Sequence, residues 1–329
     1  MAIVASSGRL IASRRLLCQG GATVTVEEQG QAVTGHCAQD GRVPDVLTEQ
    51  SRVARARESG GQPQMAFEGA TPYDRYVRTD VLHSIQQTFT DVPEERAFLV
   101  ASQIMELYFG LLRTEWELAQ QHLRADDIRG AVVVLRRSVR QFEALVESWS
   151  TIDWLTPMEF NRFRDHLGVA SGFQSWAYRR LEHMLGIKQR RLTQLYQGNS
   201  AVYEPMMLAF DGPSLYDDAI AALARGGMDI PAEVVHRDFG EDYQPRPEVE
   251  AAWLEVYARE QLGDPWWELA EVLTDISAAF TDWRHRHLMA VRRGMGNKVG
   301  SGGSSGTAWL EKSLARVVFP EVWSARTAV

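Results

Sequence analysis

The sequence predicts an all-α fold, and three observations lead to that prediction. From about Tyr73 onward, apolar residues recur at the three- and four-residue spacing of helices, and strand-like alternation is rare. Proline lies mostly at the edges of these segments, where it begins helices instead of breaking them. The 329 residues are 45% apolar and 24% charged, which is enough apolar material to bury a substantial core. We therefore expect a bundle of helices.

Residues 1–64 have a different character from the rest of the chain. They show no sustained helical or strand period, and residues 58–64 (ESGGQPQ) have the composition of a linker. We expect a poorly ordered leader over 1–64, followed by a helical domain over 65–329. Because Met65 follows the linker directly, an over-long gene prediction with its true start at Met65 is the second explanation of this leader.

The first two helices of the domain are predicted from apolar spacing. Over residues 98–118 the apolar side chains fall on one face of a long helix, and a second helix is expected over about 128–149. The face of the first is formed by Phe98, Met105, Phe109, Leu112 and Trp116.

Two further helices are predicted from their first residues. Thr156 is an N-cap with Pro157 at the first helical position, and Asp264 and Pro265 begin a fourth helix in the same way. Apolar residues continue along this fourth helix as far as Val291 at steps of three and four.

His287 lies in the apolar stripe of the fourth helix. His285 points about 200° away from it on a helix of 3.6 residues per turn, so the two imidazoles cannot bind one ion together. A lone histidine on an apolar face is more often structural than a ligand. One axial imidazole is nevertheless enough to hold the iron of a haem.

Charge and cysteine content exclude several classes of protein. Lys and Arg number 35 against 43 Asp and Glu, a net charge of −8, which argues against nucleic acid or an anionic membrane surface as a partner. Cys18 and Cys37 fit neither a zinc site nor a covalent haem attachment. No run of eighteen apolar residues occurs, and the apolar stretch after Arg14 and Arg15 is too short for an export signal. We expect a cytoplasmic protein without a membrane span.

Two polar features could serve a ligand. Residues 300–306 (GSGGSSG) interrupt the helical pattern without matching a phosphate-binding loop, so they form either a plain connector or a lid over a polar ligand. Arg164, in an aromatic-rich segment, is either a surface residue or a fork for a substrate carboxylate.

Five segments together resemble the haem-dependent tryptophan 2,3-dioxygenase family, from about Tyr73 to the C-terminus. The resemblance implies a helical-bundle haem domain of the tryptophan/indoleamine dioxygenase type. It also implies haem b held non-covalently by one axial histidine, with a tryptophan-like amino acid and dioxygen as substrates. The segments, in family order, are residues 98–109 (FLVASQIMELYF), 163–178 (FRDHLGVASGFQSWAY), 213–216 (PSLY), 283–289 (WRHRHLM) and 300–306 (GSGGSSG).

The resemblance also implies roles for individual residues. His287 would be the axial ligand, and Phe160, which stands where the family commonly has tyrosine, would contact the haem together with Tyr178. Arg164 would bind the substrate carboxylate and the Ser301 hydroxyl the substrate ammonium. The other substrate-binding positions would be Phe98, Leu167, Ser171 and Gly172 in the same chain, and Tyr73, Tyr76 and Val77 from a neighbouring subunit of a homotetramer.

Ser102 departs from the family and is, with Arg164, a candidate catalytic residue. The family normally has a histidine at this distal position, where it accepts the indole N–H. Serine is shorter and a poorer acceptor, so a bridging water or a different indole placement is expected. Haem dioxygenases of indoles can work without a distal base, so the replacement is compatible with ordinary dioxygenation as well as with an altered outcome.

We favour insertion of one oxygen atom at carbon 2 of tryptophan or a substituted tryptophan, such as β-methyltryptophan, to give a 2-oxindole. Some members of this superfamily in antibiotic pathways resemble that case. Dioxygenation with cleavage of the 2,3-bond to an N-formylkynurenine is the alternative. A non-catalytic haem sensor or carrier is a further hypothesis, and a purely structural helical scaffold is the last.

Overall fold

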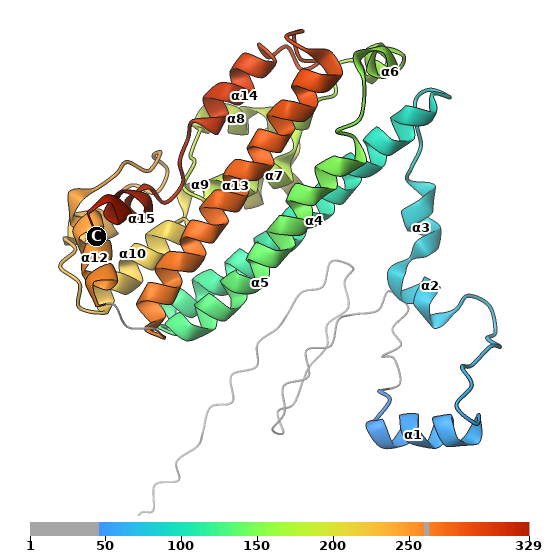
Figure 1. Ribbon diagram of the computed structural model, residues 1–329, viewed down its shortest axis with the longest axis horizontal. Helices are drawn as coiled ribbons and strands as arrows, with labels where there is room; N and C mark the ends of the chain where they lie inside the picture. Colours follow the sequence, from blue (N-terminus) through green and yellow to red (C-terminus); the bar gives the residue numbers. More distant parts are fainter. Residues whose placement is uncertain (1–45, 260–262, 329) are drawn as a thin grey trace, which may run out of the picture. The chain divides into compact units, whose positions relative to one another are not determined.

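Three long helices form the centre of the fold. The computed structural model describes residues 46–259 and 263–328. Helices α4 (Pro93–Arg124), α5 (Ile128–Glu147) and α13 (Pro265–Met295) pack side by side along their lengths (Figure 1). The buried indole N–H of Trp116 on α4 donates to Ser138 Oγ on α5 at 3.1 Å. The described ranges contain no strand, so the predicted all-α fold is confirmed.

The two helix starts predicted from an N-cap followed by proline are those of the structure, whereas α4 begins five residues before the predicted Phe98. The carboxylate of Asp264 accepts the backbone N–H groups of Trp266 and Trp267, at 2.7 and 3.4 Å, and so caps α13. Thr156 forms a capping box with Glu159 at the start of the third predicted helix.

The third predicted helix is much shorter than the other predicted helices. It is α6 (Pro157–Asn161), and the chain continues in two 3₁₀ turns, η2 (Arg164–Leu167) and η3 (Gly172–Gln174). Gly168, between these turns, has a φ of 57° and takes the backbone out of a helical path. This irregular stretch carries much of the sequence motif 163–178.

Of the remaining helices, α3 contains no buried residue, and the others extend the bundle around the long helices. Helix α7 packs on α4, and α14 packs on α13. In order they are α3 (Thr79–Ser84), α7 (Trp176–Met184), α8 (Arg190–Thr193), α9 (Ser200–Asp211), α10 (Leu215–Arg225), α11 (Ala232–Val235), α12 (Pro247–Ala258), α14 (Thr307–Leu314) and α15 (Pro320–Ser324), with short 3₁₀ turns η1 (Ser148–Thr151), η4 (Gln194–Tyr196) and η5 (Ala325–Thr327).

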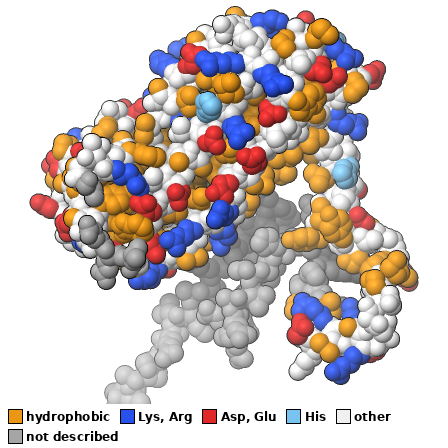
Figure 2. All heavy atoms as spheres, viewed as in Figure 1, with side chains coloured by type: hydrophobic (Ala, Val, Ile, Leu, Met, Phe, Trp, Pro, Cys, Tyr) orange, Lys and Arg blue, Asp and Glu red, His pale blue; other side chains and the backbone are white. Residues whose placement is uncertain are grey.

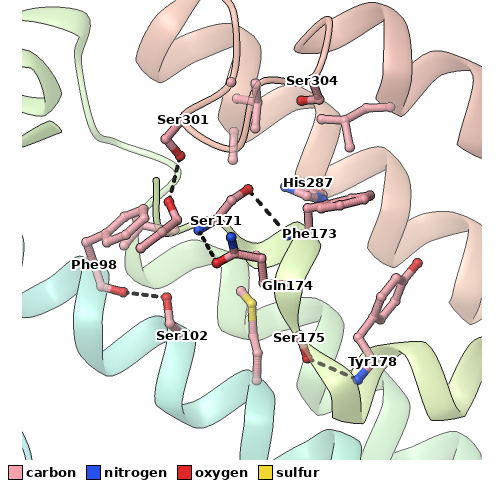
Figure 3. Close-up of a pocket in the computed structure, with 18 of the residues that line it drawn as sticks. Phe98, Ser102, Ser171, Phe173, Gln174, Ser175, Tyr178, His287, Ser301 and Ser304 are labelled. Atoms are coloured by element: carbon pink, nitrogen blue, oxygen red, sulfur yellow. Dashed lines mark hydrogen bonds between the residues drawn. The ribbon is translucent and has the colours of Figure 1, made fainter. Parts of the chain in front are cut away.

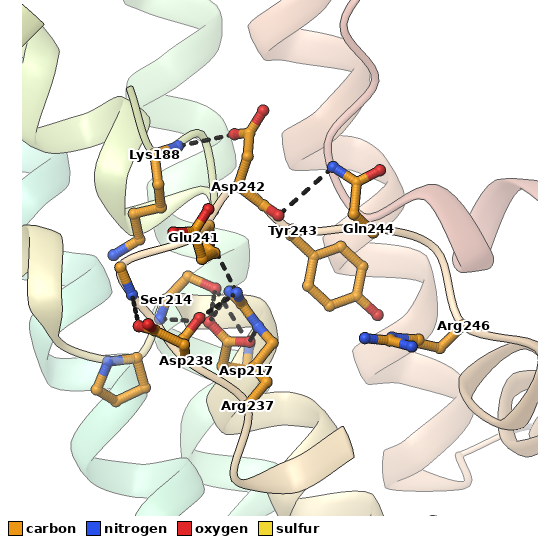
Figure 4. Close-up of polar contacts among 12 residues, drawn as sticks. Lys188, Ser214, Asp217, Arg237, Asp238, Glu241, Asp242, Tyr243, Gln244 and Arg246 are labelled. Atoms are coloured by element: carbon orange, nitrogen blue, oxygen red, sulfur yellow. Dashed lines mark hydrogen bonds and ion pairs between the residues drawn. The ribbon is translucent and has the colours of Figure 1, made fainter. Parts of the chain in front are cut away.

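A buried polar cluster fixes the loop between α11 and α12. Arg237 forms a two-pronged ion pair with Asp217 of α10, at 2.7 and 2.9 Å (Figure 4). The Lys188 ammonium donates to the carbonyls of Ala209, Phe210 and Gly212 at 2.7 to 2.9 Å, which satisfies the end of α9. These contacts hold the polypeptide between α7 and α12 in one arrangement.

The chain divides into two units, residues 1–78 and residues 79–329. Residues 1–45 of the predicted leader lie outside the described residues. The described part contains α1 (Glu49–Glu58), which the sequence reasoning missed although Thr48 caps it, and α2 (Pro72–Val77). Neither helix contains a buried residue.

The surface of the helical unit carries both signs of charge. On the face drawn in Figure 2, Lys and Arg side chains alternate with Asp and Glu and do not gather into a basic patch. Within the ranges that the structure describes, no helix is long and apolar enough to cross a membrane.

Candidate functional site

A cavity of about 770 Å³ lies between α4, α13 and the two 3₁₀ turns. Its volume falls in the range of roughly 300 to 1,000 Å³ that is usual for cofactor and small-molecule sites. Most of the residues that the sequence singled out line this one cavity. They are Phe98, Ser102, Phe160, Leu167, Ser171, Gly172, Tyr178, His287 and Ser301.

His287 presents an imidazole to the cavity from α13 (Figure 3). Burial lowers the pKa of His287 from 6.5 to about 4, so the ring is neutral at pH 7, which is the form that binds iron. His285, two residues earlier, is exposed, as its opposite direction on the helix predicts. Neither ring nitrogen of His287 makes a hydrogen bond to any described residue.

Aromatic rings enclose His287. The indole of Trp149 is stacked on the imidazole with ring centroids 4.8 Å apart and planes 15° apart. Trp283, one turn earlier on α13, lies 5.7 Å away and is tilted by 50°. Both indole N–H groups are buried without a hydrogen-bond partner among the described residues, as are the Nε atoms of Arg179 and Arg284 on the same cavity wall.

These residues fit a haem. The cavity is mostly apolar and aromatic, and it offers one neutral, unbonded imidazole. A porphyrin supplies four ligands to its iron, so one imidazole completes the binding. The unpartnered N–H groups of the lining leave room for a group that accepts hydrogen bonds. In residues 46–259 and 263–328, no three His, Cys, Asp or Glu side chains come together as a metal-binding group.

Opposite α13 (Figure 3), Phe98, Phe160 and Ser102 line the cavity, and Phe163 is buried beside them. Phe98, Phe160 and Phe163 pack together with ring centroids 5.3 to 5.7 Å apart. The Ser102 hydroxyl donates to the carbonyl of Phe98, one turn earlier on α4, at 3.0 Å (Figure 3). Since its proton is used in this bond, the lone pairs of the Ser102 oxygen remain to accept a hydrogen bond from a ligand.

The Gly/Ser loop closes one end of the cavity. Ser301 donates to the carbonyl of Ala170 at 2.7 Å, which ties the loop to the stretch between η2 and η3. A Cβ on Gly302 would lie 3.0 Å from the Cβ of Ser171, so the absence of a side chain permits this close approach. Helix α14 begins at Thr307, directly after the loop.

Arg164 is not among the residues that line the cavity. It is half-buried in η2, and its guanidinium donates to the carbonyl of Val299 at the start of the Gly/Ser loop. A guanidinium has five N–H donors, and this bond uses one of them. The structure thus connects Arg164 to the loop, and binding of a substrate carboxylate stays a prediction.

Several polar residues of the cavity were missed by sequence reasoning. Arg179 and Glu182 form a buried ion pair within α7. Arg284 donates to the carbonyls of Ser313 and Arg316, at 2.6 and 2.5 Å. Glu106 lies one turn after Ser102 on α4, and burial raises its pKa. The signal available was helical spacing, because Arg284 is three residues before His287 and Glu106 four after Ser102.

Tyr73, Tyr76 and Val77 belong to α2 in the other unit. The side chains of Tyr73 and Tyr76 are 68% and 90% exposed, an unusual degree of exposure for large apolar residues. Their predicted contact with a neighbouring subunit is not tested by one chain.

Comparisons with known proteins identify relatives over most of the chain. The sequence model of the family described as tryptophan 2,3-dioxygenase matches residues 58–209 and 254–329. A tryptophan 2,3-dioxygenase of Geobacillus thermodenitrificans is 40% identical over 261 residues, which are 79% of this chain and 93% of that protein. The enzyme of the same name from Caulobacter vibrioides is 39% identical over 255 residues, 78% of this chain and 97% of the relative.

Proposed function

The chain belongs to the tryptophan 2,3-dioxygenase family, and from this premise we propose that it oxygenates the indole ring of L-tryptophan or of a substituted tryptophan. The family makes it a haem-dependent oxidoreductase. The observation that carries the proposal is the imidazole of His287, which faces an aromatic cavity large enough for a cofactor and makes no hydrogen bond to a described residue. We assign haem b to this cavity, with His287 as its axial ligand.

When bound, the haem supplies activation of dioxygen, and the protein does the rest. Phe98 and Phe160, beside Ser102, would hold the indole against an apolar lining that excludes water and so limits side reactions. The lone pairs of Ser102 accept the indole N–H, directly or through a water. The substrate is thus fixed with its indole carbons toward the haem, and proximity supplies much of the rate enhancement.

The amino acid head group is assigned to the loop side of the cavity. In this proposal Arg164 binds the carboxylate with its remaining N–H groups while it keeps its hydrogen bond to the carbonyl of Val299. The Ser301 hydroxyl gives up its hydrogen bond to the carbonyl of Ala170 and accepts one from the substrate ammonium instead. Arg164→Leu should then weaken substrate binding by about 2 to 4 kcal/mol, as for loss of a desolvated charge pair. A tryptophan titration with near wild-type affinity in this variant would contradict the carboxylate role.

Two products are proposed, each for a specific reason. Ser102 in place of a distal base favours insertion of one oxygen atom at carbon 2, giving a 2-oxindole. The second oxygen atom must then be reduced to water by two electrons from an added reductant such as ascorbate. The names of the relatives favour dioxygenation to an N-formylkynurenine, which consumes no external electrons.

Mass spectrometry of the product formed from isotopically labelled dioxygen separates these outcomes. Tryptophan and β-methyltryptophan should be compared with and without ascorbate. Two labelled atoms with ring opening eliminate the oxindole, and one labelled atom that depends on ascorbate eliminates the dioxygenase. If neither substrate gives any product with fully reduced haem protein, the non-catalytic sensor remains.

His287→Ala tests the ligand. We expect loss of the Soret band and of stoichiometric haem, while His285→Ala, a matched change on the exposed face of the same helix, retains both. Full haem occupancy in His287→Ala would show that the ligand is wrong.

We also propose a homotetramer in which α2 of one subunit completes the site of its neighbour. The exposed tyrosines of α2 support this proposal. Light scattering should give four chains per particle, and Tyr73→Ala should weaken substrate binding while leaving the haem content unchanged.

A further inference from the structure

The indole of Trp149 is stacked on the imidazole of His287. The planes are nearly parallel, and the two residues come from segments far apart in the chain, η1 and α13. Such a long-range contact is made only after the fold has brought these segments together. It therefore belongs to the finished site and not to the local structure of either segment.

Within residues 46–259 and 263–328, the imidazole of His287 has no hydrogen bond that would set its plane. Metal-bound histidines commonly donate their second ring N–H to a carboxylate or carbonyl, which fixes the orientation of the ring. The described residues give His287 no such partner. The χ2 torsion of histidine joins sp³ and sp² carbons and has broad energy wells, so the helix backbone alone does not fix the plane either.

Trp149 is held firmly enough to provide this constraint. Its side chain is 6% exposed, and its carbonyl accepts the N–H groups of Ile152 and Asp153, at 3.0 and 2.9 Å. Its indole also packs against Trp283 at 5.6 Å. Because both its backbone and its indole are held in place, Trp149 offers the imidazole a rigid surface.

We propose that Trp149 is the positioning residue that sets the ring plane of His287, by stacking in place of the usual hydrogen bond. The inference rests on the proposed function, in which His287 is the haem ligand. Because no described carboxylate accepts the second ring N–H, the orientation of the imidazole depends on an aromatic surface. The flat face of residue 149, and not its N–H group, is then the essential property.

Three variants of the haem-loaded full chain test this role. Trp149→Phe keeps a flat face, and Trp149→Leu removes it. Trp154→Leu is the matched control, since Trp154 lies five residues later, is 40% exposed and does not line the cavity. The measurements are the rate of haem transfer to apomyoglobin and the ferric electron paramagnetic resonance spectrum, which responds to the orientation of the axial ring.

We expect Trp149→Leu to lose haem on the order of 10-fold faster, the size typical for loss of a group that orients a metal ligand, and to broaden the ferric signals. Trp149→Phe and Trp154→Leu should match the wild type in both measurements. If Trp149→Leu does not fold, Trp149→Met provides the second non-aromatic side chain.

The proposal is overturned if the non-aromatic variants behave as the wild type, if Trp149→Phe is as impaired as they are, or if Trp154→Leu shows the same change. His287→Ala distinguishes failure of the positioning role of Trp149 from failure of the assignment of His287 as the haem ligand. Loss of haem in His287→Ala with a normal Trp149→Leu removes only the positioning role, whereas retention of haem in His287→Ala removes the assignment on which it rests.

Discussion

His183 should make the stability of this protein depend on pH. The residue is fully buried in α7, with its ring edge-on to Phe210 at 5.0 Å, and neither ring nitrogen has a hydrogen-bond partner in the described part of the chain. Burial, followed by the positive charges of Lys188 and Arg179, lowers the pKa of His183 from 6.5 to about 3. The folded protein therefore holds this imidazole neutral.

The sign and size of the effect follow from that pKa. The unfolded chain binds a proton at His183 near pH 6.5 and the folded chain only near pH 3. The contribution of the neutral His183 to stability is therefore fully present above pH 6.5 and is lost as the pH falls from 6.5 toward 3. At pH 5, about 1.5 units below the pKa of the unfolded chain, protonation stabilises the unfolded chain by roughly 1.4 kcal/mol for each of these units. The free energy of unfolding should thus fall by about 2 kcal/mol.

His183→Leu removes the titrating group. Urea denaturation of the wild type and the variant at pH 7.5 and pH 5, in the same haem state, measures the difference in unfolding free energy. Relative to the wild type, the unfolding free energy of the variant should be about 2 kcal/mol higher at pH 5 than it is at pH 7.5. His285→Leu, which replaces an exposed histidine, is the control and should leave the pH dependence as it is. A difference for His183→Leu that is the same at both pH values would refute the reasoning.

Three other predictions concern stability and the loop. Glu321→Ala should lower the free energy of unfolding by about 3 kcal/mol in urea titrations. It leaves the buried hydroxyl of Tyr216, the half-buried hydroxyl of Tyr243 and the N–H of Arg246 without their acceptor; an equal loss in Glu321→Gln would contradict this. Asp264→Ala should cost about 1 kcal/mol in thermal unfolding by removing the cap of α13, and Asp264→Asn should restore it. Gly306→Ala, at a φ of 64° and against the carbonyl of Lys298, should reduce tryptophan affinity in a titration without loss of haem; unchanged affinity would show that the loop tolerates the side chain.

Local signals predicted the helices well. The caps at Thr156 and Asp264 act through atoms two or three residues away, so a short window of sequence contains the whole interaction. Helix α1 was missed because its apolar residues form no face and only its cap and terminal charges mark it. The positive φ of Gly168, which ends η2 and turns the chain toward η3, is a conformation that a glycine permits but does not require, so the sequence did not predict this irregular stretch.

Sequence reasoning found residues that line the cavity where their motif lies on a regular helix. His287 and Ser102 face the cavity because helical period fixes their directions. Arg164 lies in a 3₁₀ turn, where the period gives no direction, and its guanidinium goes to Val299 instead of the cavity. Trp149 marked the end of a predicted helix, but its contact with His287 is long-range, and no spacing in the sequence contains it.

The walls of the cavity come from residues far apart in the chain. The lining runs from Gln87, before α4, to Arg316, after α14. Contacts between such distant residues form only after long loops have been closed, so the cavity takes shape late in folding. In the proposed function, haem therefore binds to a chain that has already folded from α4 to α14.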